Sequence, residues 1–266
     1  PYCVPSRAAL LTGRYADRTG IHNVLAPDWI VRGDEFMMSA SFKTAGYATG
    51  MFGKWHLGDN YPFGPEYRDF DQVLRHYGGA IGVLADYWDN CYLDDTYYRN
   101  GEPTKVSGYC TDVFFSAARQ FIDKAVDQEK PFFVYLPTNA PHGPFLVDEA
   151  YSKPYEDKGV ATTMARFYGM ITNIDDNMAR LDSLLKELGV VENTILIFMT
   201  DNGSSCGATL DREQHVVGGY NAGMRGCKCT IWHGGSRAMS FWRWPGRWAP
   251  YQADNLTAHL DVLPTL

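Results

Sequence analysis

The longest regular pattern in the sequence is an amphipathic segment from Thr163 to Leu188. Its apolar residues recur at steps of three and four, which places them on one face of a helix. Gly189 follows and is suited to end that helix. The next apolar run, Thr194 to Met199, is short and rich in Ile and Leu, as expected of a buried strand. A helix that leads directly into a buried strand is typical of α/β proteins.

Other segments continue this alternation. We expect helices over Asp34 to Ala45 and Asp112 to Ala125, and strands over Tyr47 to Phe52 and Phe132 to Leu136. The sequence therefore predicts an α/β fold with a central, mostly parallel mixed sheet flanked by helices. The stretch from Tyr61 to Gly108 has weak periodicity, and we expect it to be an excursion over the top of the sheet.

Composition excludes some classes of function. The formal net charge of −7 argues against a nucleic-acid binder, although a few cations and a metal can still form a positive pocket for an anionic substrate. No apolar run is long enough to cross a bilayer.

Cys227 and Cys229 form a C-x-C without a second pair, which does not favour a structural zinc site. We expect the five cysteines other than Cys3 to be buried or loosely paired.

Polar clusters directly follow three of the predicted strands. They are Gly53-Lys54-Trp55-His56, Asn139-Ala140-Pro141-His142 and Asp201-Asn202-Gly203. Each cluster alone is compatible with an ordinary turn or surface loop. In a largely parallel sheet, however, functional sites gather at the carboxyl ends of the strands. Their joint occurrence indicates a site at that edge.

The N-terminal segment has the pattern of a capped helix. Pro5 suits a first helical turn, the Ala and Leu residues that follow propagate it, and Gly13 ends it. Cys3 then lies at the helix N-terminus, where free N–H groups favour an anion. A lone cysteine there would more simply be a buried, inert residue.

The string from Cys3 to Arg14 resembles the motif C-x-P-S-R-x-x-L-x-T-G-R at every specified position. This is the motif of the formylglycine-dependent, arylsulfatase-like sulfatases of the alkaline-phosphatase superfamily. Further segments match the family in the same order along the chain. They are Gly53 to Gly58 (G-K-W-H-L-G), Thr200 to Gly203 (S/T-D-N-G), Arg225 to Lys228 (R-G-x-K) and Trp232 to Arg237 (W-E-G-G-x-R).

The resemblance implies a catalytic role for six residues. Cys3 would be oxidised by a maturation enzyme to formylglycine, whose hydrate attacks sulfur and is held by Arg7. His56 would take a proton from the second hydroxyl of the hydrate. The remaining three residues, Lys54, His142 and Lys228, would contact the sulfate oxygens. Either His142 or Lys228 would protonate the leaving oxygen.

The resemblance also implies a divalent metal, usually calcium, with magnesium as the alternative. Asp201 and Asn202 would ligate it together with the modified Cys3. Hard oxygen ligands suit these cations better than zinc. Asp201 is also a candidate acceptor for the attacking hydroxyl's proton.

The activity expected from the resemblance is hydrolysis of aryl or carbohydrate sulfate monoesters. A metal and several cations would hold the three charged oxygens of such a substrate. Two alternatives stay open: a phosphate or phosphonate ester hydrolase of the same superfamily, and a catalytically inert or merely ligand-binding protein. The expected partners are a sulfated small molecule or glycan and the maturation enzyme, with no nucleic acid and no membrane span. The resemblance implies export to the periplasm, cell exterior or lysosome.

The sequence departs from the family pattern in two respects. Family members carry an Asp-Asp pair on a strand well upstream of the nucleophile, and they have a smaller C-terminal subdomain. We expect residues 1–266 to be a fragment of the catalytic domain that lacks the Asp-Asp strand and the subdomain. The isolated chain is then predicted to have weak or no activity. The second departure is His233, where the family commonly has Glu. Its effect on hydrogen bonding or on pocket polarity is left open.

Overall fold

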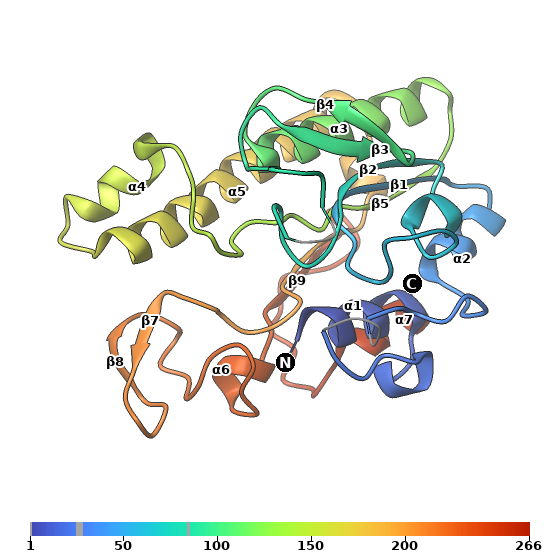
Figure 1. The fold of residues 1–266 in the computed structure, drawn as a ribbon. Coiled ribbons are helices and arrows are strands. Elements are labelled where there is room, and N and C mark those ends of the chain that lie inside the picture. Colours follow the sequence, from blue (N-terminus) through green and yellow to red (C-terminus); the bar gives the residue numbers. More distant parts are fainter. Residues whose placement is uncertain (1, 25–28, 84–85) are drawn as a thin grey trace.

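The computed structural model describes residues 2–24, 29–83 and 86–266. A five-stranded mixed sheet lies at its centre, with the strand order β4-β3-β2-β1-β5 (Figure 1). β1 pairs in parallel with both β2 and β5, whereas β3 and β4 are antiparallel additions. The strands are β1 (Ala48–Lys54), β2 (Gln72–His76), β3 (Thr96–Arg99), β4 (Glu102–Lys105) and β5 (Phe132–Tyr135). The predicted α/β fold with a mixed sheet flanked by helices is confirmed.

Helices cover both faces of this sheet (Figure 1). Successive residues of β1 point to opposite faces, so that Met51 packs against α1 residues while Phe52 packs against α3 residues. Both side chains are almost fully buried, as expected of a strand covered by helices on both faces. One face carries α3 (Cys110–Asp127) and α5 (Thr162–Glu187), and the other carries α1 (Cys3–Thr12), α2 (Met38–Thr44) and α7 (Val262–Thr265).

The stretch from Tyr61 to Gly108 is not the predicted excursion, because it supplies β2, β3 and β4 of the central sheet. Residues 84 and 85 of this stretch lie outside the described residues. The sequence pattern did not predict β2, because two of its five residues, Arg75 and His76, are polar and yet fully buried. The guanidinium of Arg75 lies 2.7 Å from a carboxylate oxygen of Glu66, which compensates its buried charge.

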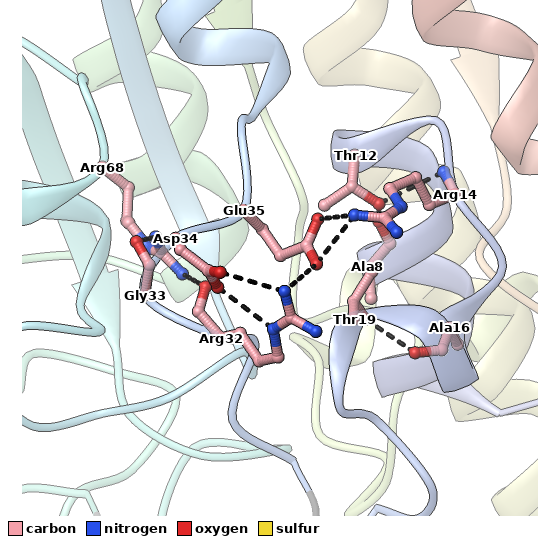
Figure 2. A network of polar contacts seen from close by, with 10 residues as sticks. All are labelled: Ala8, Thr12, Arg14, Ala16, Thr19, Arg32, Gly33, Asp34, Glu35 and Arg68. Carbon is pink, nitrogen blue, oxygen red and sulfur yellow. Dashed lines mark hydrogen bonds and ion pairs between the residues drawn. The ribbon is translucent and has the colours of Figure 1, made fainter.

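Helix α2 begins at Met38 instead of Asp34, because Asp34 and Glu35 belong to a polar network (Figure 2). Arg14 Nη1 lies 2.8 Å from a carboxylate oxygen of Glu35, and Arg32 pairs with Asp34 at 3.0 Å. Arg68 donates to the Gly33 carbonyl at 2.9 Å. These contacts hold the segment in a non-helical conformation and attach it to the end of α1.

The C-terminal part of the chain lies beside the central sheet. β6 (Leu196–Met199) is the predicted strand, but its recorded pairing is antiparallel, with β9 (Ser240–Arg243). β7 (Ala208–Leu210) and β8 (Val216–Gly219) form a separate hairpin. The remaining helices are α4 (Glu149–Glu156), α6 (His233–Ser236) and the short 3-10 turns η1 (Ala16–Thr19), η2 (Pro65–Tyr67), η3 (Val191–Asn193) and η4 (His259–Asp261). Within the described ranges, no helix is both long and apolar enough to span a membrane.

Candidate active site

The predicted site residues converge where the first turn of α1 meets the ends of β1 and β6. Arg7 is the centre of this meeting point. Its Nε and Nη2 donate to Asp201 Oδ2 at 3.1 and 2.9 Å, and its Nη1 donates to the Lys54 carbonyl at 3.0 Å. Nη1 also donates to the Tyr135 hydroxyl at 3.2 Å. One buried guanidinium thus joins α1, β1, β5 and the loop after β6.

Tyr135 is a site residue that the sequence reasoning missed. It is the last residue of β5, at the same edge of the sheet as Lys54 at the end of β1. A tyrosine that ends an otherwise apolar strand was the available signal.

Cys3 is the first residue of α1 and is only 5% exposed. Burial by itself would raise the pKa of its thiol, but the nearby Lys54 and Lys228 outweigh that effect, and the net direction is downward. This position therefore stabilises negative charge on whatever group stands there. The environment differs from that of Cys110, whose pKa is raised to about 12 mainly by burial.

The position of Lys54 depends on the glycine before it. Gly53 has a φ of +126°, and a Cβ at this residue would collide with the Pro137 carbonyl oxygen. That close approach lets Lys54 N donate to the same carbonyl at 2.7 Å. The Lys54 side chain points into the protein and is 2% exposed. Burial, with a contribution from Arg7, lowers its pKa to about 8.

His56 is held as a neutral imidazole. It is 5% exposed, and burial together with Lys54 lowers its pKa to about 2. Its Nδ1 is buried and has no hydrogen-bond partner. The ring is confined by Trp29, with centroids 5.5 Å apart, and by Gly79, where a Cβ would clash with it. Such an imidazole is suited to accepting a proton from a group placed beside it.

A second buried histidine, His76, lies next to this group and was missed by the sequence reasoning. It stands opposite Lys54 in the register of β1 and β2. Its Nδ1 contacts the Tyr77 carbonyl at 3.0 Å, and its buried Nε2 has no partner. Burial lowers its pKa to about 3. Its only signal in the sequence was its place two residues after the apolar dipeptide Val73-Leu74.

His142 follows β5 on a loop and is half-buried. Its Nδ1 lies 2.8 Å from the Gly143 carbonyl, so in the neutral ring Nδ1 carries the proton and Nε2 is an acceptor. Burial, and to a lesser extent the positive charge of Lys54, lower the pKa of His142 to about 4. The charge of Lys54 acts on both His142 and His56, which places all three in one cluster.

Lys228 reaches this cluster from the loop after β8. Its backbone N–H donates to the Ser204 carbonyl at 2.8 Å, which attaches the loop to the segment following β6. Its charge lowers the pKa of Cys3, Lys54 and His142. The structure therefore brings all of the predicted catalytic residues together.

Two of the three predicted metal ligands, Asp201 and Asn202, present oxygen atoms that fit a hard cation. Asn202 Oδ1 is buried without a hydrogen-bond partner. The pKa of Asp201 is held well below its usual range, because Arg7 and Lys54 outweigh the opposing effect of burial. Within the described residues, no group of three or more His, Cys, Asp and Glu side chains could hold a metal ion. Asp201 and Asn202 would supply only part, on the order of a third, of the six to eight oxygen ligands that calcium takes.

The loop that carries these ligands rests on α6. Gly203 N donates to the Gly235 carbonyl at 2.9 Å, and a Cβ at Gly203 would collide with Gly234. His233, the departure from the family pattern, is the first residue of α6 and is exposed.

Comparisons with known proteins agree with this geometry. The Sulfatase family model matches residues 1–266. N-acetylgalactosamine-6-sulfatase of Canis lupus familiaris is 31% identical over 271 residues, covering 93% of this chain and 49% of that protein. The uncharacterized sulfatase YdeN of Escherichia coli (strain K12) is 28% identical over 287 residues, covering 98% of this chain and 48% of its own length. The chain spans about half the length of the curated relatives it matches.

Solved structures show the same fold. The crystal structure of Ps i-CgsB in complex with k-i-k-neocarrahexaose has a TM-score of 0.85 and 27% identity, covering 100% of this chain and 60% of that one. PsFucS1 sulfatase from Pseudoalteromonas sp., at 24% identity and a TM-score of 0.77, covers 100% of this chain and 57% of that one, and supports the fold alone. These neighbours are sulfatases of the alkaline-phosphatase-like fold. From the motifs, the clustered site and these matches, we conclude that the chain belongs to the sulfatase family.

Proposed function

We propose that this protein hydrolyses sulfate monoesters, R–O–SO₃⁻ plus water giving R–OH and sulfate, with formylglycine made from Cys3 as its nucleophile. The observation that carries the proposal is the placement of Cys3 at the start of α1 among Lys54, Lys228 and Arg7, where negative charge is stabilised. The family match supports the same reaction class.

The hydrated aldehyde would supply two hydroxyl groups, one to attack sulfur and one to release sulfate from the covalent ester by restoring the aldehyde. Arg7, held by Asp201, keeps the end of α1 against β1 and so fixes the position of residue 3. His56 is neutral and buried, and it accepts the proton of the second hydroxyl.

Lys54, Lys228 and His142 bind the sulfate oxygens. Lys54 is a buried ammonium whose charge is not screened by water, so its interaction with an anion is strong. Lys228 or His142 protonates the leaving oxygen. His142 can do so after its Nε2 takes up a proton, which an anionic substrate favours.

Asp201 and Asn202 would hold a calcium ion, or magnesium as the alternative, which would neutralise charge on the substrate oxygens. The buried, unpartnered Asn202 Oδ1 supports this assignment. We expect calcium to raise the thermal unfolding midpoint of the complete protein and Asn202→Leu to abolish that increase. An equal increase in both proteins would contradict the assignment.

A phosphate monoester hydrolase of the same superfamily is the second candidate. His56 and His142 are neutral at pH 7, and the charge of Arg7 is already paired with Asp201, so the positive charge available to a substrate comes from Lys54 and Lys228. Such a cluster fits a sulfate monoester with one negative charge better than a phosphate monoester with two.

The test compares 4-nitrophenyl sulfate with 4-nitrophenyl phosphate, using the complete protein coexpressed with a formylglycine-generating enzyme. We expect sulfate ester turnover to exceed phosphate ester turnover by at least about a hundredfold in kcat/KM, roughly 3 kcal/mol. A preference for phosphate would overturn the proposal. We also propose that the maturation enzyme is a partner and that the protein is exported.

A further inference from the structure

A cavity of 370 Å³ opens directly beside His142. Its walls come from the segment that leads from β2 toward β3 and from the loop after β5. Because His142 lines the cavity and also belongs to the cationic cluster, the cavity is contiguous with the proposed sulfate site.

The described residues that line the cavity include no Asp, Glu, Lys or Arg. Most of the exposed lining surface is apolar, and the lining includes the apolar residues Ile81, Val83 and Leu146. This differs from the adjoining cluster, where Lys54, Lys228 and Arg7 gather. A sulfate ester placed with its anionic end in the cluster would therefore have an uncharged environment around the rest of the molecule.

The walls of the cavity are fixed by hydrogen bonds. The Tyr92 hydroxyl donates to the His142 carbonyl at 3.1 Å, which ties the two wall segments together. The carboxylate of Asp86 accepts from Gly82 N and from Asn90 Nδ2, both at 3.0 Å. Asp86 does not itself line the cavity, and its carboxylate holds together two residues that do. The Tyr109 hydroxyl fixes the Leu146 carbonyl at 2.8 Å.

We propose that this cavity receives the leaving group of the sulfate ester and selects leaving groups that are uncharged and about the size of one ring. This inference rests on the proposed function and deepens it by naming the substrate class. The volume lies within the range of small-molecule sites, roughly 300–1,000 Å³. A carboxylate or a second sulfate placed here would lose its hydration without gaining a cationic partner, which is costly. An aryl ring or the apolar face of a neutral sugar meets no such penalty.

The test uses two aryl sulfates of the same shape, 4-carbamoylphenyl sulfate and 4-carboxyphenyl sulfate, with the complete formylglycine-containing protein. We expect kcat/KM to favour the neutral carboxamide by about tenfold or more. Leu146→Arg places a cation at the cavity wall at a position that is 43% exposed and therefore tolerant of substitution. This variant should shift the ratio toward the carboxylate by about fivefold, as expected of one partly exposed ion pair.

Leu93→Arg is the matched control, since Leu93 is 57% exposed and does not line the cavity. It should leave the ratio at the native value. The ratio of the two kcat/KM values is compared between the native protein and each variant, which cancels the difference in chemical reactivity between the two esters. The inference is overturned if both esters are hydrolysed but Leu146→Arg leaves their ratio unchanged, or if Leu93→Arg shifts it equally. Failure of the proposed function would look different, because neither ester would then release sulfate.

Discussion

The string from Cys3 to Arg14 presents an arginine to a carboxylate at two places, but with opposite exposure. Within α1, Arg7 is 7% exposed and its partner Asp201 is 27% exposed. Just past the C-terminus of α1, Arg14 is 45% exposed and its partner Glu35 is 2% exposed. The first pair leaves the carboxylate open toward the site, and the second encloses it. The first part of the same twelve-residue string therefore belongs to the proposed site, whereas its last part is a structural end.

The surroundings of the two pairs support this division. Arg7 also donates to the Lys54 carbonyl and the Tyr135 hydroxyl, so it organises groups that belong to the site. Glu35 accepts two hydrogen bonds from Arg14 and lies 3.5 Å from Arg32, so its charge is fully used within the network of Figure 2. Substitutions at the two ends should therefore separate activity from stability.

The largest expected effect is on activity, from Arg7→Lys. An ammonium cannot reach Asp201, the Lys54 carbonyl and the Tyr135 hydroxyl at once, so the site loses its geometry. We expect kcat/KM for an aryl sulfate to fall about a thousandfold, the upper range for loss of one organised electrostatic contact. Arg14→Lys is the control and should stay within about threefold of the native enzyme, since its side chain is partly solvated. Equal losses in the two variants would remove the distinction between the ends.

Gly53→Ala should have the largest effect on stability. It introduces a collision with the Pro137 carbonyl at a residue with a φ of +126°, where the strand end is held against β5. The two costs together predict a loss of about 3 kcal/mol in the free energy of unfolding, measured by denaturant titration. Gly46→Ala, with a φ of +86° but open space around its Cβ, should lose about 1 kcal/mol. If Gly53→Ala loses no more unfolding free energy than Gly46→Ala, the close approach of residue 53 to the Pro137 carbonyl does not contribute to stability.

Glu35→Gln tests the enclosed carboxylate of the structural end. The amide keeps one acceptor but removes the charge that faces Arg14 and Arg32. We expect a loss of about 2 kcal/mol in unfolding free energy, within the range for hydrogen bonds to charged groups. The kcat/KM of the folded variant should be unchanged. A fall in kcat/KM without a loss of stability would place Glu35 in the catalytic machinery instead.

The smallest effect is expected from Thr12→Val. The Thr12 hydroxyl donates to the Ala8 carbonyl at 2.7 Å and accepts from Arg14 N at 3.3 Å, so it tightens the last turn of α1. Its loss should cost about 1 kcal/mol, seen as a small decrease in thermal unfolding midpoint with native activity. A loss as large as that of Glu35→Gln would show that this hydroxyl, and not the ion pair, anchors the end of the helix.

Much of the fold was predictable because the relevant segments bury one regular face. The predicted helices over Asp112 to Ala125 and Thr163 to Leu188 agree with α3 and α5 to within two residues at each end. β2 was not predictable by the same reasoning, since its Arg75 is buried by pairing with Glu66, a contact that periodicity does not reveal. The predicted start of α2 was wrong for a similar reason, because ion pairs to Asp34 and Glu35 override local helix preference.

The site was predictable to the extent that its residues lie in motifs. Cys3, Lys54 and Asp201 were all found in this way, and the structure clusters them. Tyr135 and His76 were not found, since each contributes a side chain from a strand that carries no motif of its own. Contacts across neighbouring strands depend on register, which only the folded structure supplies.

The most direct test of the account is peptide mass spectrometry across Cys3, on the complete protein made in its native host or with a formylglycine-generating enzyme. We expect residue 3 to have lost its sulfur and to carry an aldehyde, which converts the positive end of α1 into a nucleophile site. An unmodified thiol at residue 3 under those conditions would contradict the central claim. The inert or merely ligand-binding alternative would then be favoured.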